Sequence, residues 1–314
     1  MKKLVIALGG NALQAAGKPA TAEAQLEVVE ETSTYIADIM DKGEYQVMIA
    51  HGNGPQVGRL VLQNEYAAEI TPPMPFDVCG AMSQGMIGYH IQQGMSKILR
   101  QRGNNVPVST IVTQVVVDAE DPMFKNPTKP IGPFYTEEEA KKIADERGYS
   151  MKEDAGRGWR RVVASPKPIE IVEIDSVRCP MENNHVVITV GGGGIPVVRN
   201  AEGNLEGVAA VIDKDLASEK LAEDIDADVL MILTAVEQVY INYGKPDQKA
   251  LTEISPEEAE KYMAEGHFAP GSMLPKVEAA VKFARSKAGR RAVITSLDKA
   301  VDALNGSTGT VVVG

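Results

Sequence analysis

The stretch VVITVGGGGIPVV, residues 186–198, runs from a short apolar, strand-like segment into four consecutive glycines and a proline. Glycine costs backbone entropy on folding, and this cost is tolerated where the chain needs a positive φ or a close approach to its main chain. A tight turn needs only one or two glycines. Four of them favour an anion held by backbone N–H groups, with a flexible surface turn as the alternative for this segment alone.

Two other apolar runs end in the same way. They are LVIALGGNAL at 4–13 and QVMIAHGNGPQVG at 46–58, and each opens into a helix-like segment. Short apolar runs that end in glycine are typical of buried strands. Because ligands of open α/β sheets bind beyond the carboxyl ends of the strands, the three glycine-rich ends are predicted to converge on one crevice.

Apolar strands alternate with amphipathic helices along the chain, which predicts an α/β fold with a largely parallel sheet covered by helices on both faces. The predicted strands are 3–8, 45–50, 107–117, 186–190, 229–234, 292–296 and 310–313. The predicted helices are 22–42, 54–68, 80–102, 214–226, 255–265 and 275–288. The proline-rich region of about 118–168, with the only tryptophan, Trp159, and an acidic helix-like run, breaks this pattern and is interpreted as a small inserted subdomain.

The composition limits the possible partners. The 314 residues, 44% of them apolar, suffice for one large domain or two smaller ones, and a net charge of -11 argues against binding to nucleic acid or an anionic membrane. Cys79 and Cys179 are too few for a disulfide framework. The first apolar run ends at Leu8, too early for secretion or membrane spanning, so a cytoplasmic protein is expected. The motifs of P-loop enzymes, Rossmann dehydrogenases, zinc proteases and serine hydrolases are missing.

Two lysines stand at predicted helix starts, where the helix dipole disfavours a cation. Lys214 lies between Asp213 and Asp215, and Lys276 follows Pro275, which suits a first helical position. The aspartates have a structural explanation as caps of free N–H groups. A solvated lysine tolerates such a place at a cost of roughly a few tenths of a kcal/mol, but two lysines beside glycine-rich strand ends suggest an anionic ligand.

A collinear set of short stretches carries a family resemblance: ALGGNA, GNGPQVG, CGAMSQG, NPTKPIGPFY, EDAGRGW, GGGGIPV, IDKDLAS, ILTAV and GSMLPKVEAA. Along essentially the whole chain they resemble the carbamate kinases of the amino-acid kinase family, and NPTKPIGPFY separates these from other members. The resemblance implies a three-layer α/β/α sandwich around a mainly parallel sheet, assembled as a homodimer. Residues 1–210 are implied to bind the acid and residues 211–314 the nucleotide, with the insertion as a protruding subdomain.

The implied activity is reversible phosphoryl transfer between ATP and carbamate, giving ADP and carbamoyl phosphate with Mg²⁺. It usually runs toward ATP, at the end of arginine breakdown. Both substrates are anions, so the chemistry needs preorganised positive charge and N–H donors rather than a covalent nucleophile.

The resemblance also implies roles for individual residues. The acid and the transferred phosphoryl group are placed at Gly9, Gly10, Asn11, Gly52, Asn53 and Gly54. The nucleotide is placed at Gly191, Gly192, Gly193, Gly194 and Met273. Lys214 and Lys276 neutralise phosphate charge, Asp215 orients these lysines, and Asp213 is a candidate Mg²⁺ contact.

One departure from the wider family concerns the end of the first strand. Many relatives end it in K-x-G-G, but Ala7 stands here in place of that lysine. The resemblance implies that Lys129 of the insertion supplies the missing charge. Without the family pattern an ordinary exposed lysine is the better interpretation, and Lys125 is a second candidate. His51 is interpreted as structural, because transfer to a carboxylate needs no proton removed.

Two other functions stay open from the sequence. Another acid kinase, such as an acetylglutamate or uridylate kinase, is disfavoured by Ala7 and the insertion. A catalytically silent sensor of nucleotide or carbamoyl phosphate is disfavoured by the retained lysines, because a sensor need not balance transition-state charge. The Met and Cys residues scattered through 78–95 fit a dimer interface and fit a core equally well.

Overall fold

Eight strands form the main sheet of the computed structural model, which describes residues 1–15, 17–154 and 156–314. Their order across the sheet is β15 (Glu253–Ile254), β17 (Thr310–Val313), β16 (Arg291–Ser296), β12 (Val229–Thr234), β1 (Lys2–Leu8), β2 (Tyr45–His51), β9 (Val186–Ile188) and β3 (Val108–Thr110). Neighbouring strands run parallel except β16 and β17, which are antiparallel. The predicted mainly parallel sheet is confirmed.

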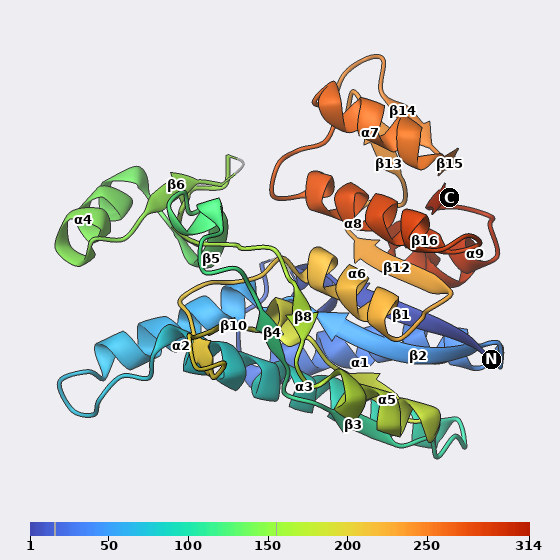
Figure 1. Ribbon diagram of the computed structural model, residues 1–314, viewed down its shortest axis with the longest axis horizontal. Coiled ribbons are helices and arrows are strands. Elements are labelled where there is room, and N and C mark those ends of the chain that lie inside the picture. Colours follow the sequence, from blue (N-terminus) through green and yellow to red (C-terminus); the bar gives the residue numbers. More distant parts are fainter. Residues whose placement is uncertain (16, 155) are drawn as a thin grey trace.

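Helices cover both faces of this sheet, because successive side chains of each strand alternate between the faces. In β1, Leu4 and Ile6 pack with one helix layer, whereas Val5 and Ala7 pack with the other. The first layer contains α1 (Ala22–Met40), α3 (Phe76–Gln101) and α9 (Ala300–Leu304). The second contains α5 (Ile174–Glu182), α6 (Lys214–Asp224) and α8 (Met273–Ser286), with α7 (Pro256–Ala264) packed on α8. The predicted three-layer sandwich is therefore confirmed (Figure 1).

The predicted strand 107–117 is wrong as a single element, because its two ends belong to different sheets. β3 stays in the main sheet, whereas β4 (Gln114–Val116) joins a second one. Between them, Gln84 of α3 donates from Nε2 to the carbonyl oxygen of Thr113 (3.0 Å) and accepts from its backbone N–H at Oε1 (2.8 Å). The N–H of Thr113 is then taken, and its carbonyl oxygen also accepts from the backbone N–H of Ile195 in the second sheet (2.9 Å), so the ladder of the main sheet stops there.

Smaller sheets complete the body of the molecule. The second sheet has the order β11 (Leu205–Gly207), β10 (Ile195–Arg199), β4 and β8 (Glu170–Ile171), and β13 (Val239–Ile241) pairs with β14 (Lys249–Leu251). Short 3₁₀ turns lie at Gly10–Ala12, Pro122–Phe124, Gly191–Gly193 and Leu297–Lys299. Helix α5 was not predicted, since Pro180 inside it removes a backbone donor and weakens the helical pattern.

Residues 129–163 form a unit that stands away from the main sheet (Figure 1). It consists of an antiparallel sheet of β5 (Lys129–Tyr135), β7 (Trp159–Val163) and β6 (Met151–Glu153), together with α4 (Glu137–Arg147). A capping box of Thr136 and Glu139 starts α4, so the acidic run is helical as predicted. The unit rests on α2 (Gly54–Tyr66) of the body. Ala155, within the EDAGRGW stretch, lies outside the described residues.

Candidate active site

The carboxyl ends of four parallel strands meet at one edge of the main sheet. Leu8 of β1 lies opposite His51 of β2, and Ile188 of β9 lies opposite Ile49. The glycine-rich segments that follow β1, β2 and β9 therefore reach the same edge, as the sequence predicts. β12 pairs with β1 on the other side and adds the segment that begins at Thr234.

The start of α6 brings charge to this edge. Asp213 is the N-cap residue, and its Oδ1 accepts a hydrogen bond from the backbone N–H of Asp215 (2.8 Å). Lys214, the first helical residue, donates from Nζ to Oδ1 of Asp215. Its stem passes Gly52, where a Cβ would lie 3.5 Å from Cδ of the lysine. The glycine after β2 thus leaves room for the lysine that follows the cap of α6.

Lys276 approaches the same carboxylate from α8. Its Nζ lies 2.8 Å from Oδ2 of Asp215, so the two lysines share one aspartate. Helix α8 begins at Met273, and Pro275 is its third residue rather than its first, so the predicted helix start is wrong by two residues. Proline is tolerated at either place because the first four N–H groups of a helix have no intrahelical partner.

The two lysines differ in ionisation although they share Asp215. Burial lowers the pKa of Lys214 to about 8, and this exceeds the opposite effect of the Asp215 charge. Burial alone would also lower the pKa of Lys276, but the charge and hydrogen bond of Asp215 raise it. Burial would raise the pKa of Asp215, yet the lysines hold it well below its usual range. A permanent carboxylate therefore holds one firmly charged lysine and one that loses its proton near pH 8.

Lys129 reaches this centre from the inserted unit. It is the first residue of β5, and its Nζ lies 2.5 Å from Oδ2 of Asp213. Asp213 thus joins the insertion to the cap of α6. The structure brings Lys129, Lys214 and Lys276 together around two aspartates, whereas Lys125 is exposed and lines neither of the cavities at this edge.

Two cavities open on either side of Lys214. One, of about 150 Å³, is lined by Lys129 and by the residues Gly10, Gly52, Asn53, Gly54, Gly192 and Lys214, among others. The second, of about 240 Å³, is lined by Lys276 and by Gly9, Gly10, Asn11, Thr234, Ala235 and Lys214, among others. Gly10 and Lys214 border both cavities. The two cavities therefore meet at Gly10 and Lys214.

A third cavity continues from the second. It measures about 530 Å³, shares Thr234 and Ala235 with the second cavity, and is bordered by Met273 at the start of α8. Its wall contains the aromatic side chains of Tyr240, Tyr243 and Phe268. A long ligand could extend from this apolar wall past Lys276 to Lys214.

Comparison with known proteins decides the family. A model of the amino acid kinase family matches residues 2–296. The chain belongs to the amino acid kinase family. Among its relatives, carbamate kinase of Clostridium perfringens is 56% identical over 99% of both chains, and carbamate kinase of Thermococcus kodakarensis is 55% identical over 100% of this chain and 99% of that one. The structure of carbamate kinase from Giardia lamblia bound to AMP-PNP matches with a TM-score of 0.90 and 48% identity, over 99% of this chain and 98% of that one.

These matches confirm the resemblance to carbamate kinases and the predicted enzyme class. The similarity to those relatives extends over nearly the whole chain, and it includes the inserted unit. It is therefore a kinase of the carbamate kinase type, and neither another acid kinase nor a sensor is favoured. None of the helices in the three described ranges is long and apolar enough to cross a membrane.

The four glycines that follow β9, Gly191–Gly194, are buried and closely packed against neighbouring residues. Gly192, Gly193 and Gly194 have φ angles of +66°, +91° and +88°, which favour glycine. A Cβ on any of the four would come within 2.2–2.4 Å of a neighbouring atom; the neighbours are His51 for Gly191, Asn53 for Gly192, Ile212 for Gly193 and Val115 for Gly194. Gly192 lines the 150 Å³ cavity, whereas none of the four lines the cavity beside Lys276.

His51 and Ser83 contact the glycine-rich segments at this edge of the sheet. His51 is buried against Gly191, its Nδ1 lies 2.9 Å from the carbonyl oxygen of Gly52, and burial lowers its pKa to about 4. A neutral, buried imidazole fits the structural interpretation. Ser83 of α3 accepts a hydrogen bond from Nδ2 of Asn53 (2.8 Å) and so orients that side chain. This contact could not be predicted from the sequence, because Ser83 lies inside a long helix, 30 residues away from Asn53.

The residues at this edge do not form a protein-held metal site. Asp213 uses one oxygen for the cap of α6 and the other for Lys129, and Asp215 uses both for its lysines. Within the described ranges, no group of three or more His, Cys, Asp or Glu side chains is placed to hold a metal ion. The candidate Mg²⁺ contact of Asp213 stays a prediction that this arrangement does not support.

Proposed function

We propose that this kinase transfers a phosphoryl group reversibly between ATP and carbamate, giving ADP and carbamoyl phosphate. The observation that carries the proposal is the position of Lys214, which borders both cavities at the sheet edge with Lys129 on one side and Lys276 on the other. Such an arrangement suits transfer between two anions, because each phosphate position has a preorganised cation. The similarity to proteins named carbamate kinase supports the choice of acceptor.

The nucleotide is assigned to the side of the carboxy-terminal half, residues 211–314. The base would lie in the 530 Å³ cavity beside Tyr240, Phe268 and Met273, and the phosphates would extend into the 240 Å³ cavity toward Lys276. The Giardia relative was solved with AMP-PNP, which supports a nucleotide on this fold. Since Gly191–Gly194 do not line this cavity, their contribution to the nucleotide is proposed to be indirect, through packing.

The acceptor is assigned to the 150 Å³ cavity in the half formed by residues 1–210. Gly54 begins α2 and Asn53 is its N-cap residue, so backbone N–H groups with the positive end of a helix dipole face this cavity. Gly10 and Gly52 let an anion approach the main chain from the other strands. Gly192 also lines this cavity, so it joins the acceptor contacts predicted after β1 and β2.

The mechanism follows from the charges. Lys214 would stay with the phosphoryl group throughout the transfer, while Lys276 and Lys129 neutralise the nucleotide side and the acceptor side. Asp215 and Asp213 hold these ammonium groups in place, so little reorganisation is needed as the charge moves. Ala7 of β1 is fully buried against the second helix layer, and Lys129 is the residue proposed to supply the charge of the absent strand-end lysine.

Magnesium, assembly and direction belong to the same proposal. Mg²⁺ would arrive on the nucleotide phosphates, since it binds readily through phosphates and water. A homodimer is proposed through Met82, Gly85 and Tyr89, which are exposed and lie on one side of α3 because they are three and four residues apart.

The reaction is proposed to run toward ATP in the cytoplasm, consuming carbamoyl phosphate from arginine breakdown.

A coupled assay tests the activity. The protein is incubated with carbamoyl phosphate, ADP and Mg²⁺, and ATP formation is measured. We expect ATP to appear only when all components are present. Phosphorylation of acetylglutamate instead would identify another acid kinase, and tight nucleotide binding without turnover would identify a sensor.

Sedimentation at micromolar concentration tests the proposed homodimer, and a monomer would refute it.

A further inference from the structure

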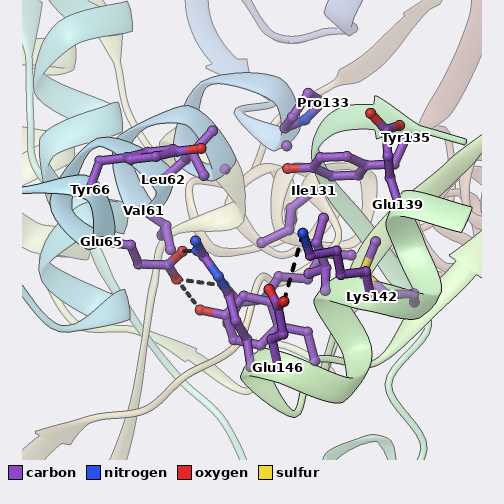
Figure 2. A pocket seen from close by; sticks show the side chains of 17 residues that line it. Val61, Leu62, Glu65, Tyr66, Ile131, Pro133, Tyr135, Glu139, Lys142 and Glu146 are labelled. Atoms are coloured by element: carbon purple, nitrogen blue, oxygen red, sulfur yellow. Dashed lines mark hydrogen bonds and ion pairs between the residues drawn. The ribbon is translucent and has the colours of Figure 1, made fainter.

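A cluster of ion pairs fixes the inserted unit to the far end of α2. Glu65, in the last turn of α2, accepts hydrogen bonds from Arg147 Nη1 at Oε2 (2.5 Å), from the hydroxyl of Tyr149 at Oε1, and from Arg161 Nη1 at Oε1 (3.3 Å). We call these four residues the Glu65 clamp. Figure 2 shows the dashed contacts converging on Glu65 at the side of a cavity of about 330 Å³.

The three donors of the clamp come from separate parts of the insertion. Arg147 ends α4, Tyr149 precedes β6, and Arg161 lies in β7. The guanidinium of Arg161 also stacks on the ring of Tyr149, 3.5 Å from its centroid. Burial, followed by the hydrogen bond to Glu65, raises the pKa of Tyr149, so its hydroxyl stays a donor. One carboxylate of the body thus holds both the α4–β6 connection and β7 of the insertion.

The same face of α2 makes two more contacts with the insertion. Gly58, Val61 and Glu65 follow one another at helical spacing, so they lie on one side of the helix. A Cβ on Gly58 would lie 2.1 Å from Cα of Gly132, so the backbones of α2 and β5 touch there. Val61 packs with Ile131 in a small apolar cluster. Close contact, apolar packing and charge therefore follow one another along a single helix face.

These contacts between α2 and the insertion lie close to Lys129. β5 pairs with β7 so that Lys129 lies opposite Val163 and Ile131 lies opposite Arg161. Arg161 is therefore only two residues along β7 from the partner of Lys129. The other end of α2 carries Asn53 and Gly54 at the 150 Å³ cavity, which Lys129 also lines. One helix thus presents acceptor contacts at its start and holds the strand of Lys129 along its length.

We propose that Glu65 is a positioning residue for the reaction: it clamps the insertion to α2 and so holds Lys129 at Asp213 and the acceptor cavity. This inference rests on the proposed role of Lys129 in phosphoryl transfer. Glu65 itself does not line the cavities at the sheet edge, so its effect must pass through the insertion.

Kinetics of Glu65→Ala test the proposal. We expect turnover to fall about tenfold, less than the roughly hundredfold cost of a full 1 Å misplacement, because Lys129 still pairs with Asp213, while nucleotide affinity stays unchanged. Glu65→Gln, which keeps the shape and one acceptor oxygen, should fall between the wild-type protein and Glu65→Ala. Glu69→Ala is the matched control, since Glu69 is exposed just beyond α2 and should leave turnover unchanged.

A double variant separates positioning from general stability. If Glu65 acts through Lys129, Glu65→Ala should cause no further loss of turnover in a Lys129→Ala background. An equal further loss in that background, or normal turnover of Glu65→Ala alone, would overturn the proposal.

Hydrogen exchange gives a readout that does not depend on the reaction. Backbone amides of 129–135 should exchange faster in Glu65→Ala than in the wild-type protein or in Glu69→Ala. Unchanged exchange in this segment would show that Glu65 is no clamp, even if the chain proved to have another activity. Absence of ATP formation by the wild-type protein would instead refute the proposed function and leave the exchange result to decide on the clamp.

Discussion

The body and the insertion deliver their lysines to the sheet edge in different ways. Lys214 and Lys276 come from α6 and α8, which pack on each other and on the sheet, and their shared partner Asp215 is 3% exposed. Lys129 comes from a separate small sheet and is 23% exposed beside Asp213. Core packing fixes the first two charges, whereas a contact surface along α2 fixes the third. Substitutions on the two sides should therefore differ in what they disturb.

The largest effect is expected on the insertion side. Lys129→Ala should lower turnover on the order of a hundredfold or more, as for loss of one preorganised charge or donor. Nucleotide affinity and thermal stability should hold, because the side chain borders the acceptor cavity and packs little. Steady-state kinetics with a nucleotide titration measure both. Lys125→Ala is the control, and a Lys129→Ala enzyme with near-normal turnover would show that the insertion serves shape or assembly instead.

On the body side, Lys276→Ala should affect binding and turnover together. We expect nucleotide affinity and turnover each to fall about tenfold or more, the usual worth of a hydrogen bond to a charged group, because Lys276 is proposed to face the nucleotide phosphates. The fold should persist, since Lys214 still pairs with Asp215. Calorimetric nucleotide binding beside turnover checks this. Lys261 is an exposed lysine of α7, so Lys261→Ala should change neither nucleotide affinity nor turnover. Unchanged kinetics of Lys276→Ala would contradict the proposed role of Lys276.

The buried glycines of the body should matter for stability. Gly193→Ala places a Cβ 2.3 Å from the carbonyl oxygen of Ile212 at a φ of +91°, so the free energy of unfolding should fall by about 1–3 kcal/mol. Gly203 has a similar φ of +84° with open space around it, so Gly203→Ala measures the cost of φ alone. Denaturant unfolding compares the two. Equal losses would mean that close packing does not explain the glycines after β9.

The smallest effect is expected from pH. The ratio kcat/KM should fall as pH rises through about 8, because Lys214 loses its proton there. Lys276→Ala should move this fall to higher pH, since the charge of Lys276 lowers the pKa of Lys214. Unfolding does not explain such a loss of activity. Between about pH 8 and 10.5, Lys214 binds fewer protons in the folded state than in the unfolded state. Its deprotonation therefore makes the free energy of unfolding rise with pH in this range. A profile that is flat to pH 10 would contradict the assignment.

Local patterns were enough to predict which residues meet at the candidate site. The runs that end in Gly9, Gly52 and Gly191 marked three strand ends of one parallel sheet, because a short apolar run followed by glycine leaves few alternatives. Lys214 and Lys276 were visible because a cation at a helix start conflicts with the dipole. The structure supplies the compensation, Asp215 between them.

Long-range contacts limited the prediction elsewhere. The strand 107–117 looked continuous, because nothing near it in the sequence shows that Gln84 takes the backbone groups of Thr113. The start of α8 was misplaced because proline is acceptable at several positions of a first turn. The close packing of the four glycines was not predicted, because the side chains that exclude a Cβ there include His51, Asn53 and Val115, which lie far away in the chain.

The sequence by itself determined the alternation of strands and helices, the edge of the sheet where the site lies, and the family, because periodicity, glycine and short motifs are local properties. Only the tertiary structure decided which charges pair, since Lys129 and Asp213 are 84 residues apart in the chain and meet across two units. It also decided how the insertion is held, because the Glu65 clamp joins side chains whose partners lie 82 to 96 residues away. Pairing over such distances depends on the path of the whole chain, which no local pattern encodes.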